Sequence, residues 1–353
     1  MPLDPFFRER LRVHRRYLLG QARDRIRDRL RLPRTPDAVP PAPASSSVRR
    51  RSGAGRRALT PRERHRRAAL RWDAKELETV GIPGPEMTTE EHRIPVPGYP
   101  EVRVRLYRPA SAPEPAPACL CLAGGAFRIG GIDFPTVDAG FRRRAEKSGV
   151  VMIAVGYALA PEARYPTQVE QTYAAWQWMH ANAESLGLDA QRFGVSGTSA
   201  GGNLAAALTL VNRDRADLPL RLQVLEVPVT DLTGRHIDLR ATWALGIPAI
   251  IALRELRSVA RTYLSDRRRA REPYASPLRA ATHAGLPPAV ILTAEYDPLR
   301  SDGAAYAAAL RRAGVDASAN RYLGLTHDAP IFVGVLEASR RWEDEVVSAL
   351  RRL

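Results

Sequence analysis

Residues 192–212 read RFGVSGTSAGGNLAAALTLVN, and this stretch decides the fold. Residues 192–196 form a short, largely apolar run of the length of a buried strand, and residues 200–212 have the length of a helix. Between them lies GTSAG (197–201), a G-x-S-x-G sequence. A sharp strand-to-helix turn leaves little room for side chains, so the two glycines fit it and Ser199 projects its hydroxyl above the sheet. The stretch therefore predicts an exposed, nucleophilic serine.

Short apolar runs and helical stretches alternate on both sides of this turn. The first two runs alternate in polarity like half-buried antiparallel strands. The others are separated by helical sequence, which is typical of a mostly parallel sheet with helices on both faces, here of eight strands. The predicted strands are His92–Val96, Val102–Tyr107, Ala118–Leu122, Val150–Val155, Arg192–Ser196, Leu220–Val227, Ala289–Thr293 and Ala317–Tyr322. The predicted helices are Thr136–Lys147, Val169–Ser185, Ala200–Asn212, Asp302–Ala313 and Val333–Arg352.

A serine hydroxyl needs a base that takes its proton, because it is a poor nucleophile near neutral pH. Of seven histidines, His327 alone follows the last predicted strand, in the loop GLTH (324–327). Asp297 lies just past the strand Ala289–Thr293, where it can accept the proton-bearing nitrogen of His327. Taken separately, Asp297 could simply form a turn, and His327 could be an ordinary surface residue. In the order Ser, Asp, His they predict a catalytic triad.

The segment LAGGAF (122–127) follows a buried strand upstream of Ser199. Backbone N–H groups of such a turn, together with that of Ala200, can bind the negative oxygen of a tetrahedral intermediate. A plain glycine turn is the alternative interpretation.

Five segments in order resemble the hormone-sensitive-lipase-like esterases, also called bacterial family IV, and the likeness covers roughly residues 85–352. They are AGGAF (123–127) at the family's H-G-G-G-F, GYALAPE (156–162) at Y-R-L-A-P-E, GTSAGGN (197–203) at G-D-S-A-G-G-N, YASPL (274–278) and DPLRSDG (297–303). The resemblance implies an α/β-hydrolase fold with a helical cap and a carboxylesterase that needs neither cofactor nor metal. It implies Ser199 as nucleophile, Asp297 as acid and His327 as base, with oxyanion donors among Gly124, Gly125, Ala126 and Ala200.

The chain departs from the family pattern at three positions. Ala123 stands where the family has a histidine that braces the oxyanion loop, so we expect the loop to be held less firmly. Ala126 replaces the last glycine of that motif, and Thr198 replaces the aspartate beside the nucleophile. These departures leave open a biosynthetic acyltransferase, an elimination or cyclisation enzyme, or a non-catalytic binder of a small ligand.

The chain divides into four predicted parts. Residues 1–32 form a basic amphipathic helix, residues 33–59 a disordered linker rich in Pro, Ser and Arg, and residues 60–88 an N-terminal cap helix region. Residues 89–353 form the catalytic domain, with a cap insertion at about 235–272. We expect three apolar residues of this insertion to close over the substrate pocket: Trp243, Leu245 and Ile247. The pocket should be small enough to favour short and medium acyl chains.

The positive charge is concentrated at the N-terminus. Residues 1–72 hold 21 Arg, no Lys and six acids, a net of +15 out of +16 for the whole chain. Residues 4–32 therefore suit either an anionic membrane surface or a cap helix whose arginines face water. Nucleic-acid binding is disfavoured, because few aromatics interleave with the arginines and no nucleic-acid motif is present. The expected partner is a small-molecule ester. The expected location is the cytoplasm, with the protein either free or bound peripherally to a membrane.

Overall fold

The computed structural model describes residues 3–12 and 59–353. The chain separates into two compact units, residues 4–65 and, with the extreme N-terminus, residues 66–353. In the smaller unit residues 5–12 are helical. The predicted helix from residue 13 onward and almost all of the predicted linker lie outside the described residues.

Helix α2 (Pro61–Thr79) begins where the sequence predicts. The Thr60 hydroxyl accepts from the backbone N–H of Glu63 at 3.2 Å, and the Glu63 carboxylate accepts from the N–H of Thr60 at 2.6 Å. This reciprocal pair satisfies two of the N–H groups that a helix start leaves without partners. Pro61 fits the first helical position, because it has no N–H to satisfy.

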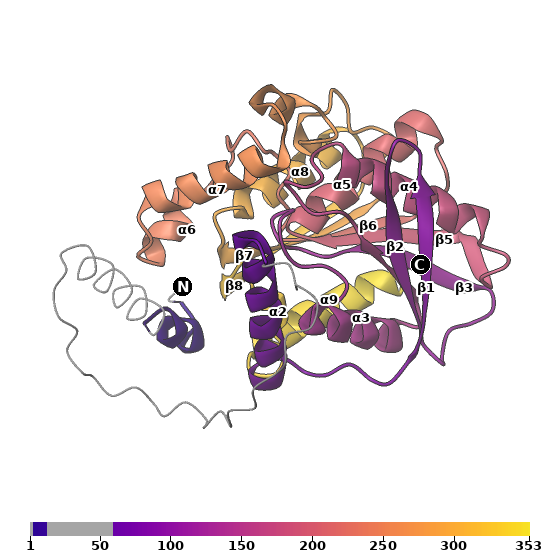
Figure 1. The fold of residues 1–353 in the computed structure, drawn as a ribbon, viewed down its shortest axis with the longest axis horizontal. Coiled ribbons are helices and arrows are strands. Elements are labelled where there is room, and N and C mark those ends of the chain that lie inside the picture. The colour runs from indigo at the N-terminus through magenta and orange to yellow at the C-terminus, as the bar shows by residue number, and fades with distance from the viewer. Residues whose placement is uncertain (1–2, 13–58) are drawn as a thin grey trace, which may run out of the picture. The chain divides into compact units, whose positions relative to one another are not determined.

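The larger unit is built on one eight-stranded sheet of order β1-β2-β4-β3-β5-β6-β7-β8 (Figure 1). Strand β2 pairs antiparallel with both β1 and β4, and the remaining pairs are parallel. The strands are β1 (Thr88–Val96), β2 (Tyr99–Arg108), β3 (Ala116–Leu122), β4 (Val151–Gly156), β5 (Leu188–Thr198), β6 (Leu222–Glu226), β7 (Ala289–Tyr296) and β8 (Ala317–Thr326). The predicted α/β fold with a mostly parallel sheet is confirmed.

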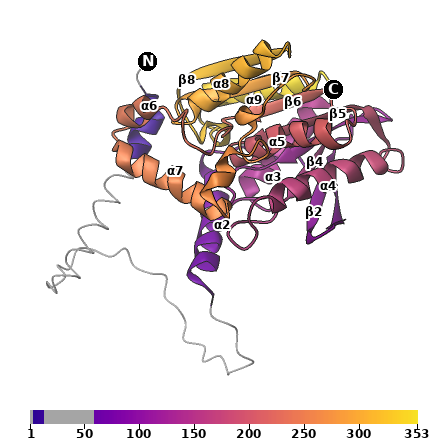
Figure 2. The same cartoon turned by 90° about the horizontal axis from the view of Figure 1, so that it is seen from above.

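Helices cover both faces of this sheet. On one face α3 (Pro135–Ser148) packs with α9 (Glu337–Leu350); the other face carries α4 (Thr167–Ala181), α5 (Ala200–Arg215) and α8 (Arg300–Arg312). Figure 2 looks onto the second of these layers. Every residue of β3 and β6 is buried, as expected for central strands covered on both faces.

One helix begins later than the sequence predicts. Apolar spacing places its start at Val333, but α9 begins at Glu337. The N–H of Gly334 donates to the carbonyl of Val80, so this part of the chain is held against the segment that follows α2. Among the described residues, no helix is long and apolar enough to cross a membrane.

Candidate active site

Ser199 occupies the apex of the turn between β5 and α5. Its backbone has φ 56° and ψ −112°, a left-handed φ that non-glycine residues rarely adopt. A Cβ added to Gly197 would lie 2.2 Å from the carbonyl oxygen of Gly201, and one added to Gly201 would lie 2.0 Å from that of Leu122. Only glycine therefore fits on either side of the serine, and the strained turn presents its hydroxyl at the carboxyl edge of the sheet.

Three predicted side chains meet at this edge although they are far apart in the sequence. His327 directly follows β8, and its Nδ1 lies 2.8 Å from Oδ2 of the fully buried Asp297, which follows β7. Because a carboxylate only accepts, Nδ1 carries the proton, and Nε2 accepts from the Ser199 hydroxyl at 2.9 Å. The arrangement can pass a proton from Ser199 to His327 while Asp297 fixes the tautomer.

The charge of Asp297 controls the basicity of His327. Burial lowers the pKa of the imidazole, but the charge and hydrogen bond of Asp297 outweigh burial and raise the pKa to about 9. The His327 side chain is 34% exposed, so solvent screens part of this effect. The result is a histidine more basic than the ordinary value of 6.5, which favours accepting the serine proton.

The predicted oxyanion donors lie next to Ser199. A Cβ added to Gly124 would lie 3.6 Å from Cβ of Ser199, and Ala200 is the next residue in the chain. Gly125 and Ala126 have positive φ angles of 129° and 54°, which turn the chain sharply after β3. Within the described part of the chain, the backbone N–H groups of Gly124, Gly125 and Ala126 donate to no acceptor. These groups are available to a substrate oxygen.

A tyrosine supports the loop at Ala123, where the family pattern has a histidine. The buried Tyr157 hydroxyl donates to the carbonyl of Ala123 at 2.7 Å. Tyr157 lies just after β4, within the family motif quoted above, but nothing in the sequence assigned it a role. The loop is therefore held firmly at the position where the sequence predicted weaker support.

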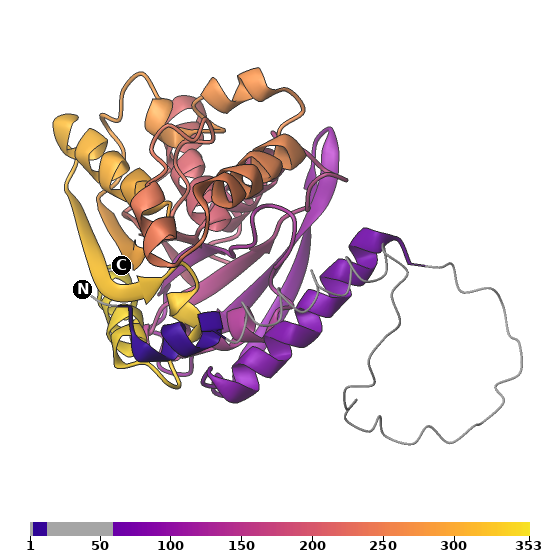
Figure 3. The same cartoon turned by 90° about the vertical axis from the view of Figure 1, so that its left-hand side faces the viewer.

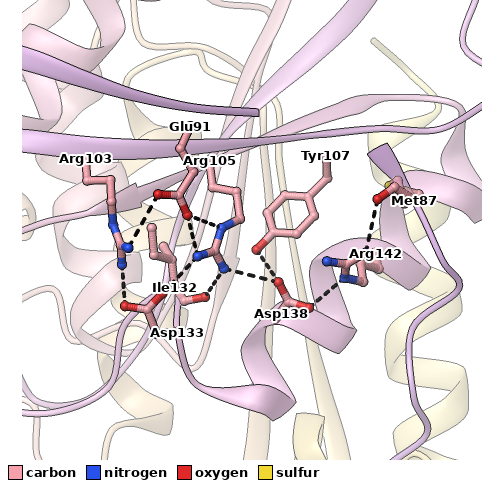
Figure 4. Close-up of polar contacts among 9 residues, drawn as sticks. All are labelled: Met87, Glu91, Arg103, Arg105, Tyr107, Ile132, Asp133, Asp138 and Arg142. Carbon is pink, nitrogen blue, oxygen red and sulfur yellow. Dashed lines mark hydrogen bonds and ion pairs between the residues drawn. The ribbon is translucent and has the colours of Figure 1, made fainter. Parts of the chain in front are cut away.

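The oxyanion loop runs from Ala123, after β3, to the start of α3, and a second set of contacts fixes its end next to α3. Arg105 on β2 donates from Nη1 to the carbonyl of Ile132 at 2.9 Å and from Nη2 to Asp133 at 2.9 Å (Figure 4). The same guanidinium reaches Glu91 on β1 and Asp138 on α3. Arg105 thus joins the β1–β2 hairpin, the oxyanion loop and α3.

The middle of the loop contacts the predicted cap insertion. The ring of Phe127 stacks on that of Tyr263, with centroids 3.7 Å apart and planes 7° from parallel. Arg128 donates to Ser258 at 3.3 Å and pairs with Glu255, both on α7 (Ala249–Tyr263). Helix α7 therefore packs on the outside of the oxyanion loop.

A cavity of about 390 Å³ opens beside Ser199 and His327. It is bounded by the oxyanion loop, by α3, and by Asp73, Leu77 and Gly81 of α2 and the segment after it. Most of this lining is apolar. Besides Ser199 and His327, its polar members are Asp73, Thr136, Arg143, Arg144, Thr198 and Asp328.

The insertion contributes no side chain to the lining of this cavity. Residues 235–272 contain α6 (Leu239–Ala244) and α7. Trp243 is 74% exposed, whereas Leu245 is buried elsewhere. The expectation that Trp243, Leu245 and Ile247 close the pocket is therefore not met, and the nearest cover comes from α2. Figure 3 shows the orange α7 above the strand ends and the purple α2 below them.

Known proteins match the chain over most of its length. A family model described as "alpha/beta hydrolase fold" matches residues 119–331. An ethyl acetate hydrolase of Pseudomonas putida is 35% identical over 75% of this chain and 80% of its own length. A carboxylesterase of Mycobacterium tuberculosis is 33% identical over 79% of this chain and 86% of its own length.

Solved structures agree with these sequence matches. The thermostable carboxylesterase EstE1 from a metagenomic library has a TM-score of 0.75 and 34% identity, covering 83% of this chain and 97% of its own. The chain belongs to the hormone-sensitive-lipase-like esterases of the α/β-hydrolase fold. An esterase of Pyrobaculum calidifontis is similar as well, with a TM-score of 0.74 and 33% identity over 82% of this chain and 93% of its own. As a member of this esterase family, the chain is a carboxylic ester hydrolase.

Proposed function

We propose that this esterase cleaves carboxylic esters of short to medium acyl chain through an acyl-enzyme on Ser199. The observation that carries the proposal is the hydrogen-bonded series from Ser199 through His327 to the buried Asp297. Each residue has a role that its surroundings support: a hydroxyl at a strained apex, a base of raised pKa, and an acceptor that holds the base in place.

In the first step the Ser199 oxygen attacks the acyl carbon, and its proton moves to Nε2 of His327. The carbonyl oxygen becomes negative and accepts hydrogen bonds from backbone N–H groups among those of Gly124, Gly125, Ala126 and Ala200. The C–O bond to the alcohol then breaks, and the alcohol leaves with the proton that His327 returns.

In the second step water attacks the acyl-enzyme. His327 takes a proton from the water, the same N–H groups bind the second oxyanion, and the acid leaves as the proton returns to the Ser199 oxygen. The charge on Asp297 stabilises the imidazolium that forms in both steps.

The size of the cavity supports a small substrate. Its volume of about 390 Å³ lies near the lower end of the roughly 300–1,000 Å³ of ligand pockets. We expect p-nitrophenyl esters of four to eight carbons to give the highest kcat/KM, and emulsified long-chain triglyceride to react poorly.

The test is p-nitrophenyl butyrate hydrolysis by Ser199→Ala, with Ser196→Ala as the control. Ser196 is buried three residues earlier on β5, and its hydroxyl donates to the sulfur of Cys121. Ser199→Ala should abolish turnover while remaining folded, and Ser196→Ala should retain it. Wild-type turnover by Ser199→Ala would contradict the proposal.

The departures from the family pattern left open acyl transfer, elimination and ligand binding without catalysis, and the esterase relatives favour hydrolysis over all three. In an acyltransferase an added alcohol captures most of the acyl group, whereas in a hydrolase water does. An elimination enzyme releases an alkene without an acyl-enzyme. A binding protein turns over no ester at all, so product analysis separates the four cases.

We also propose that the arginine-rich residues 4–32 bind anionic membrane surfaces. The charge of residues 1–72 supports this, because basic residues near an anionic leaflet contribute attraction that salt screens. Vesicles of phosphatidylserine and phosphatidylcholine should pellet the full chain but not a chain without residues 1–58. Equal pelleting of both would contradict the proposal, and would favour a helix whose arginines face water.

A further inference from the structure

Helix α3 forms one wall of the cavity beside Ser199. The α3 residues that line the cavity are Thr136, Val137, Gly140, Phe141, Arg143 and Arg144. Residues three and four apart lie on the same face of a helix, so Gly140 is at the centre of the face that α3 turns to the cavity. A side chain at position 140 would lie over the preceding turn, toward Thr136 and Val137, and would therefore enter the cavity.

This wall is fixed to the nucleophile turn. Arg144, one helical turn after Gly140, donates from Nη1 and Nη2 to the carboxylate of Glu226 at 2.7 and 2.8 Å. Glu226 ends β6, and its carbonyl accepts from the backbone N–H of Ser199 at 2.8 Å. Gly140 is thus about 6 Å along α3 from a residue that is bonded to the neighbour of Ser199.

Packing does not explain why residue 140 is glycine. Within the ranges that the structure describes, five glycines line the cavity: Gly81, Gly124, Gly125, Gly130 and Gly140. A Cβ added to any of the first four would lie between 1.8 and 3.2 Å from the nearest protein atom, so those positions leave no room for a side chain. A Cβ added to Gly140 would have its nearest neighbour, Nη2 of Arg143, at 3.9 Å, which is an ordinary contact.

Glycine at this position also costs stability. Gly140 lies in the interior of the 14-residue α3, where glycine is less favourable than alanine because it loses more backbone freedom on folding. What glycine provides here is open space in the cavity. The reason for Gly140 therefore lies with the molecule that fills the cavity.

We propose that Gly140 sets the upper limit of acyl-chain length, by leaving open the part of the cavity that the distal carbons of the chain enter. The proposal rests on the proposed function, which places the acyl chain in this cavity, and it adds the position that determines the length of that chain. The neighbouring lining residues Val137 and Phe141 are apolar, so they suit methylene groups rather than water.

The size of the effect follows from the carbons that a side chain would displace. Each methylene that the acyl chain buries contributes about fourfold to kcat/KM. In a closely packed cavity, a methyl group at position 140 excludes about one methylene of the substrate, and a leucine side chain excludes about three. The kcat/KM for octanoate divided by that for acetate should therefore fall about fourfold in Gly140→Ala and about 60-fold in Gly140→Leu.

The experiment measures p-nitrophenyl acetate, butyrate, hexanoate and octanoate hydrolysis by wild type, Gly140→Ala, Gly140→Leu and Glu146→Leu, each shown to be folded by its urea transition. Glu146→Leu is a matched control, because it places the same side chain on the same helix at an exposed position that does not line the cavity. Its octanoate-to-acetate ratio should equal that of the wild type. If Gly140→Leu does not fold, Gly140→Ala decides the question.

Two further measurements separate a steric limit from other causes. Gly140→Ala should unfold at higher urea than the wild type while its octanoate-to-acetate ratio falls, because alanine favours the helix and fills the cavity. A less stable Gly140→Ala would show that α3 itself is disturbed, and would contradict the proposal. Ethyl, butyl and hexyl acetate vary only the alcohol, so their relative kcat/KM values should be the same in Gly140→Leu as in the wild type.

Three results of the ester series would overturn the proposal: an unchanged octanoate-to-acetate ratio in the folded Gly140 variants, an equal fall in Glu146→Leu, or a fall for hexyl acetate as large as that for octanoate. The last result would place the alcohol in this cavity instead of the acyl chain. All three leave cleavage through Ser199 standing, whereas hydrolysis of these esters by Ser199→Ala would refute the proposed function itself.

Discussion

Replacing Tyr157 by phenylalanine should slow catalysis without weakening substrate binding. The substitution removes one hydroxyl, whose bond to the Ala123 carbonyl supports the start of the oxyanion loop. We expect kcat on p-nitrophenyl butyrate to fall about tenfold with KM nearly unchanged, because the loop donors act mainly on the transition state.

The size of this effect follows from the burial of the bond. Ala123 is 3% exposed, so its carbonyl would lose its partner with little water to replace it. An unsatisfied buried acceptor costs about 1–3 kcal/mol, of which part appears as lost stability and part as a misplaced loop. Loss of a whole oxyanion donor costs about 10²–10³-fold, and Tyr157→Phe should cost less because the N–H groups of Gly124 and Gly125 remain.

The control is Tyr165→Phe, which removes a buried hydroxyl that binds Glu272 and not the oxyanion loop. Both variants should lose comparable stability in urea, but only Tyr157→Phe should lose kcat.

Ala123→His should change kcat less than twofold, since the hydroxyl of Tyr157 already donates to the Ala123 carbonyl. A large gain from Ala123→His, or an unchanged kcat in Tyr157→Phe, would refute the argument that this tyrosine is the brace.

Two further predictions follow from the geometry around Ser199. The kcat/KM for butyrate ester should rise with pH as His327 loses its proton, because only the neutral imidazole accepts from Ser199. Asp297 raises that pKa, so the midpoint should lie between 6.5 and about 9; a midpoint below 6.5 would contradict the coupling. Gly201→Ala should unfold the turn, because the added Cβ would lie 2.0 Å from the Leu122 carbonyl oxygen. Gly140→Ala in α3 should be tolerated, because the atom nearest to its added Cβ is 3.9 Å away. Equal melting temperatures of the two glycine variants would show that the turn can relax.

The fold and the meeting of Ser199, Asp297 and His327 could be predicted because they depend on local patterns. Gly197 and Gly201 around Ser199 mark a turn that tolerates no side chain, and the apolar runs on either side mark central strands. In a parallel sheet the carboxyl ends of strands meet at one edge, so residues that follow β7 and β8 had to lie near Ser199. Chain order and strand ends were sufficient for this part.

The supports of the site could not be predicted in this way. Tyr157 and Ala123 are 34 residues apart, and Arg144 and Glu226 are 82 apart, with no periodicity that links them. The insertion was misjudged for a related reason. An apolar residue such as Trp243 indicates burial or an exposed face equally well, and only the packed structure places it away from the cavity.

The central claim is that Ser199 forms the covalent intermediate. Wild-type protein should be incubated with a fluorophosphonate, digested and analysed by mass spectrometry, with His327→Ala treated in parallel. We predict one adduct per chain on the peptide that contains Ser199, formed far more slowly in His327→Ala because the serine has lost its base. An adduct on another residue, or equally fast labelling of both proteins, would contradict the account.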